Sequence, residues 1–146
     1  MSCEGVKNLK DLPMAAEFKD IQPIKKGMSS DKKYFVTAKN GEHFLLRLAD
    51  YEEFERKKAE YELIKKLFRL NVPMPSPIDF GVCNNKTGVY TLLSWIDGEE
   101  AEITIPKLSK EKQYALGIES GRILRRIHTL NAPENISDWE TRYFST

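Results

Sequence analysis

Two stretches in the first third of the chain are β-like, because Tyr, Phe, Val and Thr are concentrated in them. They cover Asp31–Lys39 and Glu42–Ala49, and the dipeptide Asn40-Gly41 separates them. Asn-Gly supplies the positive φ angles that a two-residue hairpin turn requires. The pattern therefore predicts an antiparallel hairpin.

A long helix is predicted directly after this hairpin. The segment Tyr51–Leu70 contains no Gly or Pro, and Phe54 and Tyr61 belong to a series of apolar residues at helical spacing. Asp50 is the expected N-cap of this helix. Pro73 is expected to end it, because the residue before a proline is pushed out of the α region.

Three more strands and a second helix follow from the same reasoning. Strands are predicted at Ile78–Val82 and Val89–Ile96, which a polar turn separates, and a weaker first strand is predicted at Asp20–Lys26. Helical periodicity over Ser109–Leu130 predicts the second helix. The tail Asn131–Thr146 has too few apolar residues to form a domain.

The order of these elements indicates the fold class. Two hairpins that flank one helix are typical of an α+β fold in which the helix packs on a sheet. We therefore expect a five-stranded antiparallel sheet with one long helix, followed by a further helix.

Composition and charge limit the classes of partner. Lys and Arg number 23 against 22 Asp and Glu, so the formal charge of +1 gives no electrostatic footprint for nucleic acid or an anionic membrane. Cys3 and Cys83 have no metal-ligand spacing and are too few for a disulfide framework. We expect a cytoplasmic protein that binds neither nucleic acid nor membrane, so any polyanion it binds has to be small.

One charged residue interrupts an apolar strand. The run Phe44–Ala49 is apolar on both faces except for Arg47 in its middle. An unpaired buried charge costs several kcal/mol or more, so the guanidinium needs a carboxylate, an anionic ligand or both. Glu60 is the best candidate, because it shares a helix face with Leu63 and Ile64. A purely structural ion pair is the alternative.

A short polar turn is predicted before the hairpin. Gly27-Met28-Ser29-Ser30 offers backbone N–H groups and two hydroxyls as donors to an anion. By itself this composition is also that of an ordinary turn.

Taken together, these signals resemble the amino-terminal lobe of aminoglycoside phosphotransferases, which have a protein-kinase-like fold. The resemblance covers about Phe18 to Leu130. It depends on five short motifs that occur in the family's order. They are Gly27-Met28-Ser29-Ser30, the basic residue of Phe44-Leu45-Leu46-Arg47-Leu48, Glu60, Pro73-Met74-Pro75, and Leu92-Leu93-Ser94-Trp95-Ile96-Asp97-Gly98.

The resemblance implies a site for ATP or GTP with Mg²⁺. The serine turn, Ser29 and Ser30, would cover the phosphates, and Arg47 paired with Glu60 would clamp them. The hinge after the fifth strand would bond the base. The hinge residues implied are Leu93, which would line the base pocket, and Ser94 and Ile96, whose backbone would bond the adenine edge.

The resemblance also implies a division of the chain at the hinge. Residues 1–96 would form the nucleotide-binding N-lobe. Residues 97–146 would continue the hinge and supply the first helical part of a truncated C-lobe, with the helix Ser109–Leu130 as its main element.

Two departures from the family pattern bear on activity. The strand position is usually Lys, and here it is Arg47. The family's His-Gly-Asp loop, its downstream Asn and its Mg²⁺-binding Asp are expected beyond the end of this sequence, since neither His43 nor His128 is followed by Gly-Asp. We therefore expect no catalytic residue and no metal ligand in this chain, and no phosphotransfer by the chain alone.

Two hypotheses remain open on function. The first is a phosphotransferase that acts on a small hydroxylated acceptor, for which an aminoglycoside, a macrolide, choline or a sugar amine are equally compatible. The second is a non-enzymatic remnant or interaction module that folds but transfers nothing. A lobe cut from its partner would leave apolar positions on the second helix partly uncovered and would invite a homodimer or aggregation, whereas a stand-alone protein should cover them with its own tail or a symmetric partner. These positions are Ile123, Leu124 and Ile127.

Overall fold

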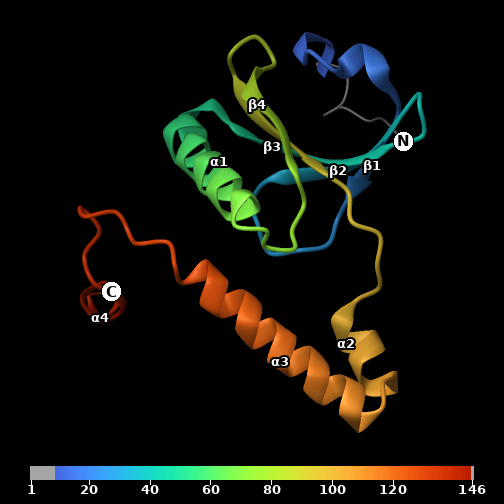
Figure 1. Ribbon diagram of the computed structural model, residues 1–146. Helices are drawn as coiled ribbons and strands as arrows, with labels where there is room; N and C mark the ends of the chain where they lie inside the picture. The colour runs from blue at the N-terminus through green and yellow to red at the C-terminus, as the bar shows by residue number, and fades with distance from the viewer. Residues whose placement is uncertain (1–8, 146) are drawn as a thin grey trace. The chain divides into compact units, whose positions relative to one another are not determined.

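The computed structural model describes residues 9–145, so Cys3 lies outside the described residues. The chain consists of two compact units, Met1–Glu100 and Ala101–Thr146 (Figure 1). The first unit contains the sheet and the long helix, and the second is helical. Each unit is considered by itself.

The first unit is built on a single five-stranded antiparallel sheet, which confirms the α+β class. The spatial order of the strands is β1-β2-β3-β5-β4, so β3 and β5 lie in its interior. The strands are β1 (Phe18–Ile24), β2 (Lys32–Ala38), β3 (His43–Asp50), β4 (Pro77–Cys83) and β5 (Gly88–Ser94).

The long helix begins and ends differently from the sequence-based expectation. Its first three residues, Tyr51–Glu53, form a 3-10 turn, and α1 covers Phe54–Arg69. Asp50 occupies the N-cap position of this 3-10 turn, but its side chain makes no cap hydrogen bond. The helix stops before Pro73 because Asn71 takes a left-handed conformation, with φ of 56°, which Asn tolerates at a helix C-terminus.

The β2–β3 turn is also longer than predicted. Gly41 has φ of 88°, whereas Asn40 is not among the positive-φ residues. The Gly41 N–H donates to the Ala38 carbonyl at 3.0 Å, so Lys39 and Asn40 are the central residues of the turn and Gly41 follows them. The prediction of a two-residue Asn-Gly turn is therefore wrong, although the hairpin itself forms.

One face of the sheet carries the main hydrophobic core. Val36 and Leu46 on adjacent strands are fully buried there. The residues that cover this face come from two short 3-10 turns near the N-terminus, Leu9–Asp11 and Ala15–Glu17. Leu9 itself is only 3% exposed. Periodicity did not predict these turns, because three residues are too few to show a helical repeat.

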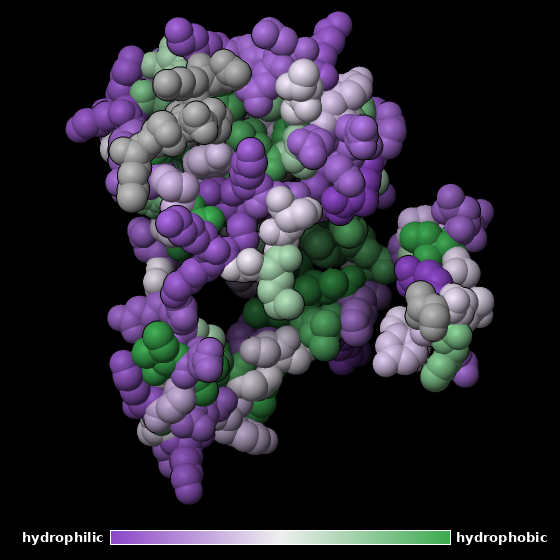
Figure 2. Space-filling view, turned by 180° about the vertical axis from the view of Figure 1, so that it is seen from behind, coloured by the Kyte–Doolittle hydropathy of each residue, from purple (hydrophilic) through white to green (hydrophobic). Residues whose placement is uncertain are grey.

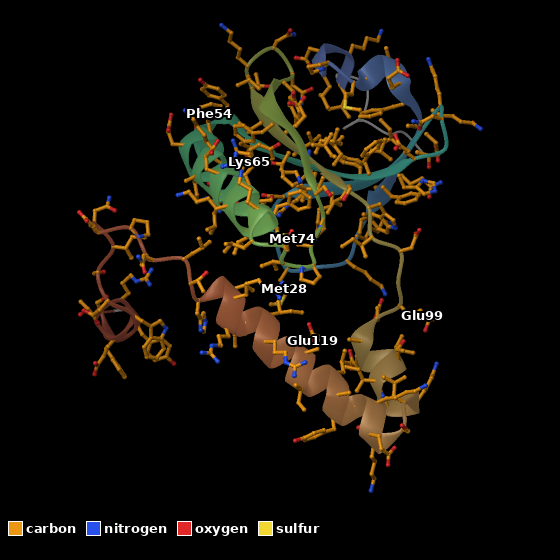
Figure 3. All side chains as sticks on the ribbon, viewed as in Figure 1. Met28, Phe54, Lys65, Met74, Glu99 and Glu119 are labelled. Atoms are coloured by element: carbon orange, nitrogen blue, oxygen red, sulfur yellow. The ribbon has the colours of Figure 1, made fainter. Side chains whose placement is uncertain are left out.

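The opposite face of the sheet packs against α1 (Figure 1). Aromatic rings make this contact: Phe80 of β4 lies with its ring centroid 5.7 Å from that of Phe54 and 5.3 Å from that of Tyr61. Lys65 extends over the Tyr61 ring at 5.4 Å (Figure 3). Because side chains alternate along a strand, Arg47 lies on this face, whereas Leu46 lies on the core face.

The second unit contains α2 (Ala101–Thr104), the 3-10 turn Ile105–Lys107, α3 (Lys110–Ile127) and α4 (Trp139–Phe144). Ser109 caps α3 by accepting a hydrogen bond from the Lys112 N–H. The short helix α4 was not predicted, since the segment Asn131–Thr146, in which it lies, has few apolar residues. No helix among residues 9–145 is long and apolar enough to cross a membrane, and much of the surface in Figure 2 is hydrophilic.

We expect Leu46→Ala to destabilise the protein by about 2–5 kcal/mol, because it removes a side chain that is fully buried in the core. Leu63→Ala is the control. Leu63 lies on α1 with 48% of its surface exposed, and its loss should change stability by less than about 1 kcal/mol. Urea unfolding followed by circular dichroism measures both. Equal effects would contradict the assignment of the core to the Leu46 face.

Candidate functional site

The site centres on Arg47, which lies in the middle of β3. On the neighbouring strands it is opposite Lys33 of β2 and Thr91 of β5. The Arg47 side chain keeps 22% of its surface exposed. An interior strand thus holds a permanent positive charge near the protein surface.

Two carboxylates neutralise this guanidinium. The pair predicted from the sequence forms, with Arg47 Nη1 3.3 Å from Glu60 Oε1. The closer partner is Asp31, whose Oδ2 lies 2.7 Å from Arg47 Nη2. Asp31 is 7% exposed and comes directly before β2. Sequence reasoning missed it, because an Asp beside a serine turn is typical of an ordinary turn residue.

A second buried cation completes the cluster. Lys57 Nζ lies 2.6 Å from Asp31 Oδ2 and 3.2 Å from Glu60 Oε2. The Lys57 residue is only 5% exposed, which is unusual for a lysine. The signal that points to it is its position three residues before Glu60 on the same face of α1. We name Asp31, Arg47, Lys57 and Glu60 the charge cluster; its formal charges cancel.

The electrostatics of the cluster favour an ionised Asp31. Burial alone raises the pKa of this carboxyl. The hydrogen bond from Lys57 and the positive charge of Arg47 outweigh the effect of burial, so the pKa lies below its usual value of 3.8. At neutral pH the cluster therefore holds two cations and two carboxylates.

The serine turn lies against this cluster. Ser29 Oγ accepts a hydrogen bond from the Asp31 N–H at 3.2 Å and lies 3.4 Å from Arg47 Nη2. Gly27 has φ of 105°, and Lys33 Nζ occupies the space that a Cβ there would take. Met28 is fully exposed at the tip of the turn (Figure 3). The turn thus brings a hydroxyl to the guanidinium across 18 residues of sequence.

Arg47 retains a hydrogen-bond donor that no protein group uses. Its Nε atom is buried and has no hydrogen-bond partner. A guanidinium has five N–H donors, and leaving one of them buried and unpaired is costly. Because this Nε is buried, an anionic ligand such as a phosphate group would instead meet the exposed part of the Arg47 side chain, beside the serine hydroxyl.

The predicted hinge residues lie at the end of β5. Leu93 is 6% exposed. Ser94 N–H donates to the Ser76 carbonyl at 2.9 Å, and Ser94 Oγ accepts from the Ser76 N–H at 2.7 Å. Ile96 lies beyond the strand and is 55% exposed.

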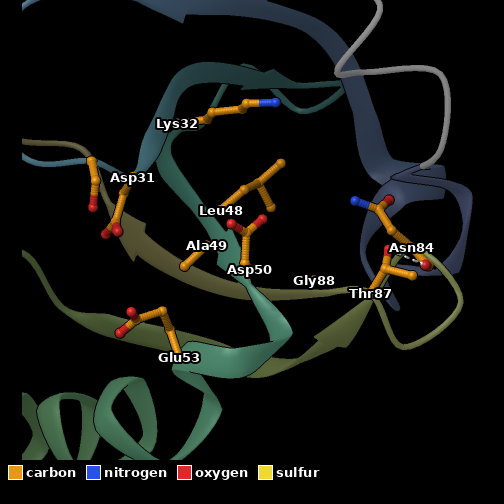
Figure 4. Close-up of a pocket in the computed structure, with 10 residues that line it drawn as sticks. Asp31, Lys32, Leu48, Ala49, Asp50, Glu53, Asn84, Thr87 and Gly88 are labelled. Atoms are coloured by element: carbon orange, nitrogen blue, oxygen red, sulfur yellow. Dashed lines mark hydrogen bonds between the residues drawn. The ribbon is translucent and has the colours of Figure 1, made fainter.

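A separate polar pocket of about 350 Å³ lies at the other end of β3 and β5 (Figure 4). Asp50 and Glu53 line it together with Asp31, and Ser30 and Lys32 stand at its edge. Ser30 is the one predicted site residue that lines this pocket.

Metal ligands are not grouped within the part of the chain that the structure describes. Residues 9–145 contain no cluster of three or more His, Cys, Asp and Glu side chains that is able to hold a metal ion.

The sheet, the helix and the helix-to-sheet ion pair define a kinase-like protein of the α+β class. The chain belongs to the phosphotransferase enzyme family, whose model matches residues 20–145. This match confirms the resemblance that the sequence motifs indicated. Comparison with curated proteins gives no match.

The lowered pKa of Asp31 predicts a pH dependence of stability. Its ionised form contributes stability above pH 3.8, and this contribution is lost as the pH falls through the still lower pKa of the folded state. We expect Asp31→Asn to be less stable than the wild type at about pH 7, and the difference to shrink between about pH 4 and pH 2.

Urea unfolding of both proteins across this pH range checks the expectation. Lys57→Met, which removes the ammonium that lowers the pKa, should flatten the same part of the wild-type profile. A difference between wild type and Asp31→Asn that stays constant down to about pH 2 would show that ionisation of Asp31 contributes nothing.

Proposed function

We propose that this chain binds ATP or GTP for phosphoryl transfer to a small hydroxylated acceptor. One observation carries the proposal. The Arg47 guanidinium lies 3.4 Å from the hydroxyl of the serine turn, and the Arg47 side chain keeps 22% of its surface exposed. Membership of a phosphotransferase family makes a nucleotide phosphate the most direct anionic ligand for this arrangement.

In this proposal the phosphates approach Arg47 from the serine turn. Arg47 clamps them, and Ser29 donates a hydrogen bond from its hydroxyl. Ser30 donates a further hydrogen bond from the exposed end of the turn. Glu60 keeps the guanidinium oriented through its 3.3 Å contact.

The base is proposed to lie at the hinge. Leu93 would line the apolar wall behind it. The N–H of Ser94 is already bonded to Ser76, so Ser94 would contribute its carbonyl oxygen, and the N–H would come from Ile96. These groups do not distinguish ATP from GTP.

Phosphoryl transfer also requires Mg²⁺ ligands and a carboxylate that orients the acceptor hydroxyl. Mg²⁺ would neutralise charge on the transferred phosphoryl group. We assign no residue of this chain to either role, because neither His43 nor His128 is followed by Gly-Asp. We therefore propose a nucleotide-binding lobe over residues 1–96 and the beginning of a second lobe over 97–146, inactive by themselves.

The non-enzymatic interaction module stays the alternative. Leu124 of α3 is 52% exposed, while Ile123 and Ile127 are partly buried. A homodimer through these side chains stays a prediction that sedimentation of the purified chain tests.

Arg47→Ala should lower the affinity for ADP by about tenfold or more, because a charge-assisted phosphate contact is lost. The affinity for adenosine, which has no phosphate, should not change. Calorimetric titration of the 146-residue chain with both ligands makes the measurement.

Arg56→Ala is the matched control for this variant. Arg56 also pairs with a glutamate, Glu53, but its side chain is 59% exposed on the first turns of α1. The control should bind both ligands like the wild type. An ADP affinity that Arg47→Ala leaves unchanged would remove Arg47 from the phosphate site.

A further inference from the structure

The charge cluster contains two residues that the proposed function does not use. Asp31 and Lys57 have side chains that are only 3% and 6% exposed, so neither can touch a nucleotide directly. Their contact at 2.6 Å joins the end of the serine turn to the first half of α1. A buried ion pair of this kind gives little net stability over apolar residues of similar volume.

Asp31 connects three parts of the fold, two through one carboxylate oxygen and one through its backbone N–H. Asp31 Oδ2 accepts from Lys57 Nζ of α1 at 2.6 Å and from Arg47 Nη2 of β3 at 2.7 Å. The backbone N–H of the same residue donates to Ser29 Oγ in the turn. Substituting the Asp31 side chain would therefore release the helix and the guanidinium together, on either side of the backbone that holds the serine hydroxyl.

Lys57 determines how strongly Asp31 neutralises the positive charge of Arg47. Without the lysine, the remaining members Arg47, Asp31 and Glu60 would have a formal charge of −1, which repels a phosphate. With it, the cluster is neutral, and Asp31 divides its charge between two cations. Arg47 then keeps positive potential for a ligand at the exposed part of its side chain.

We propose that Asp31 and Lys57 are positioning residues for phosphate recognition: their buried pair fixes the serine turn and the Arg47 guanidinium in the orientation that an anion requires. This inference rests on the proposed nucleotide site. It adds residues to that site that act only through Arg47 and Ser29.

The test is Asp31→Asn, because an effect of net charge and an effect of positioning predict opposite changes in its ADP affinity. Asparagine has nearly the same shape but leaves the cluster with a formal charge of +1, so charge alone would strengthen ADP binding. Positioning predicts an ADP affinity about tenfold lower, with adenosine affinity unchanged. ADP binding that is unchanged or tighter would overturn the proposal.

Lys57→Met should lower ADP affinity in the same selective way. The matched control is the exposed pair of Arg56, on α1, and Glu53, in the 3-10 turn before it. Glu53→Gln and Arg56→Met should change neither affinity. A parallel loss of ADP and adenosine binding with a lower melting temperature would show a purely structural pair and overturn the proposal.

A measurement without ligand separates this proposal from the proposed function. The buried Nε–H of Arg47 should give a resolved, slowly exchanging NMR signal in the wild type, and Asp31→Asn should abolish its protection. A signal that persists in Asp31→Asn overturns the positioning role. Wild-type protein that binds ADP no better than adenosine overturns the nucleotide site, whatever the signal shows.

One variant keeps the test decisive where Asp31→Asn does not fold. Asp31→Glu retains the negative charge but moves the carboxylate by one methylene, so it disturbs position without changing the formal charge of the cluster. Positioning predicts the same selective loss of ADP affinity for Asp31→Glu. Wild-type ADP affinity in this variant would overturn the proposal.

Discussion

The arrangement of the side of the sheet that packs against α1 depends on one carboxylate. Asp31 Oδ2 lies within 2.7 Å of both Arg47 Nη2 and Lys57 Nζ, and it is buried between β3 and α1. A shared anion of this kind holds two like charges close together that would otherwise repel each other. The position of α1 on the sheet and the course of the serine turn therefore have a common anchor.

Stability alone does not explain why the chain has this cluster. Apolar residues at the four positions would avoid the desolvation of four charges, and such replacements are often neutral or stabilising. The other face of the sheet shows the simpler solution, since Val36 and Leu46 are fully buried there among apolar neighbours. Two faces of one sheet thus differ in chemistry although their strands are the same, which is the pattern expected when one face supports the fold and the other carries a ligand.

The sequence predicted those parts of the structure that have a strong repeat or a conspicuous conflict. The five strands and α1 were found from alternation and helical spacing, and Arg47 with Glu60 from a charge inside an apolar strand. The 3-10 turns that carry Leu9 were not found, because they are too short for a period.

The two missed members of the charge cluster show a different limit of sequence reasoning. Asp31 resembles a turn residue, and Lys57 resembles one of many solvated lysines on a charged helix. Only the crossing of α1 over β3 buries them together. Their significance arises from a tertiary contact between positions 26 residues apart, which no local pattern encodes.

The cluster also gives a physical reason for arginine at a strand position where related kinases usually have lysine. A lysine ammonium has three donors, and Asp31, Glu60 and Ser29 would use all of them in the geometry seen around residue 47. Arginine has five, so it can satisfy the same three acceptors with donors to spare. Asp31, Lys57 and Arg47 therefore belong together, because each of these charges is compensated only when the other two are present.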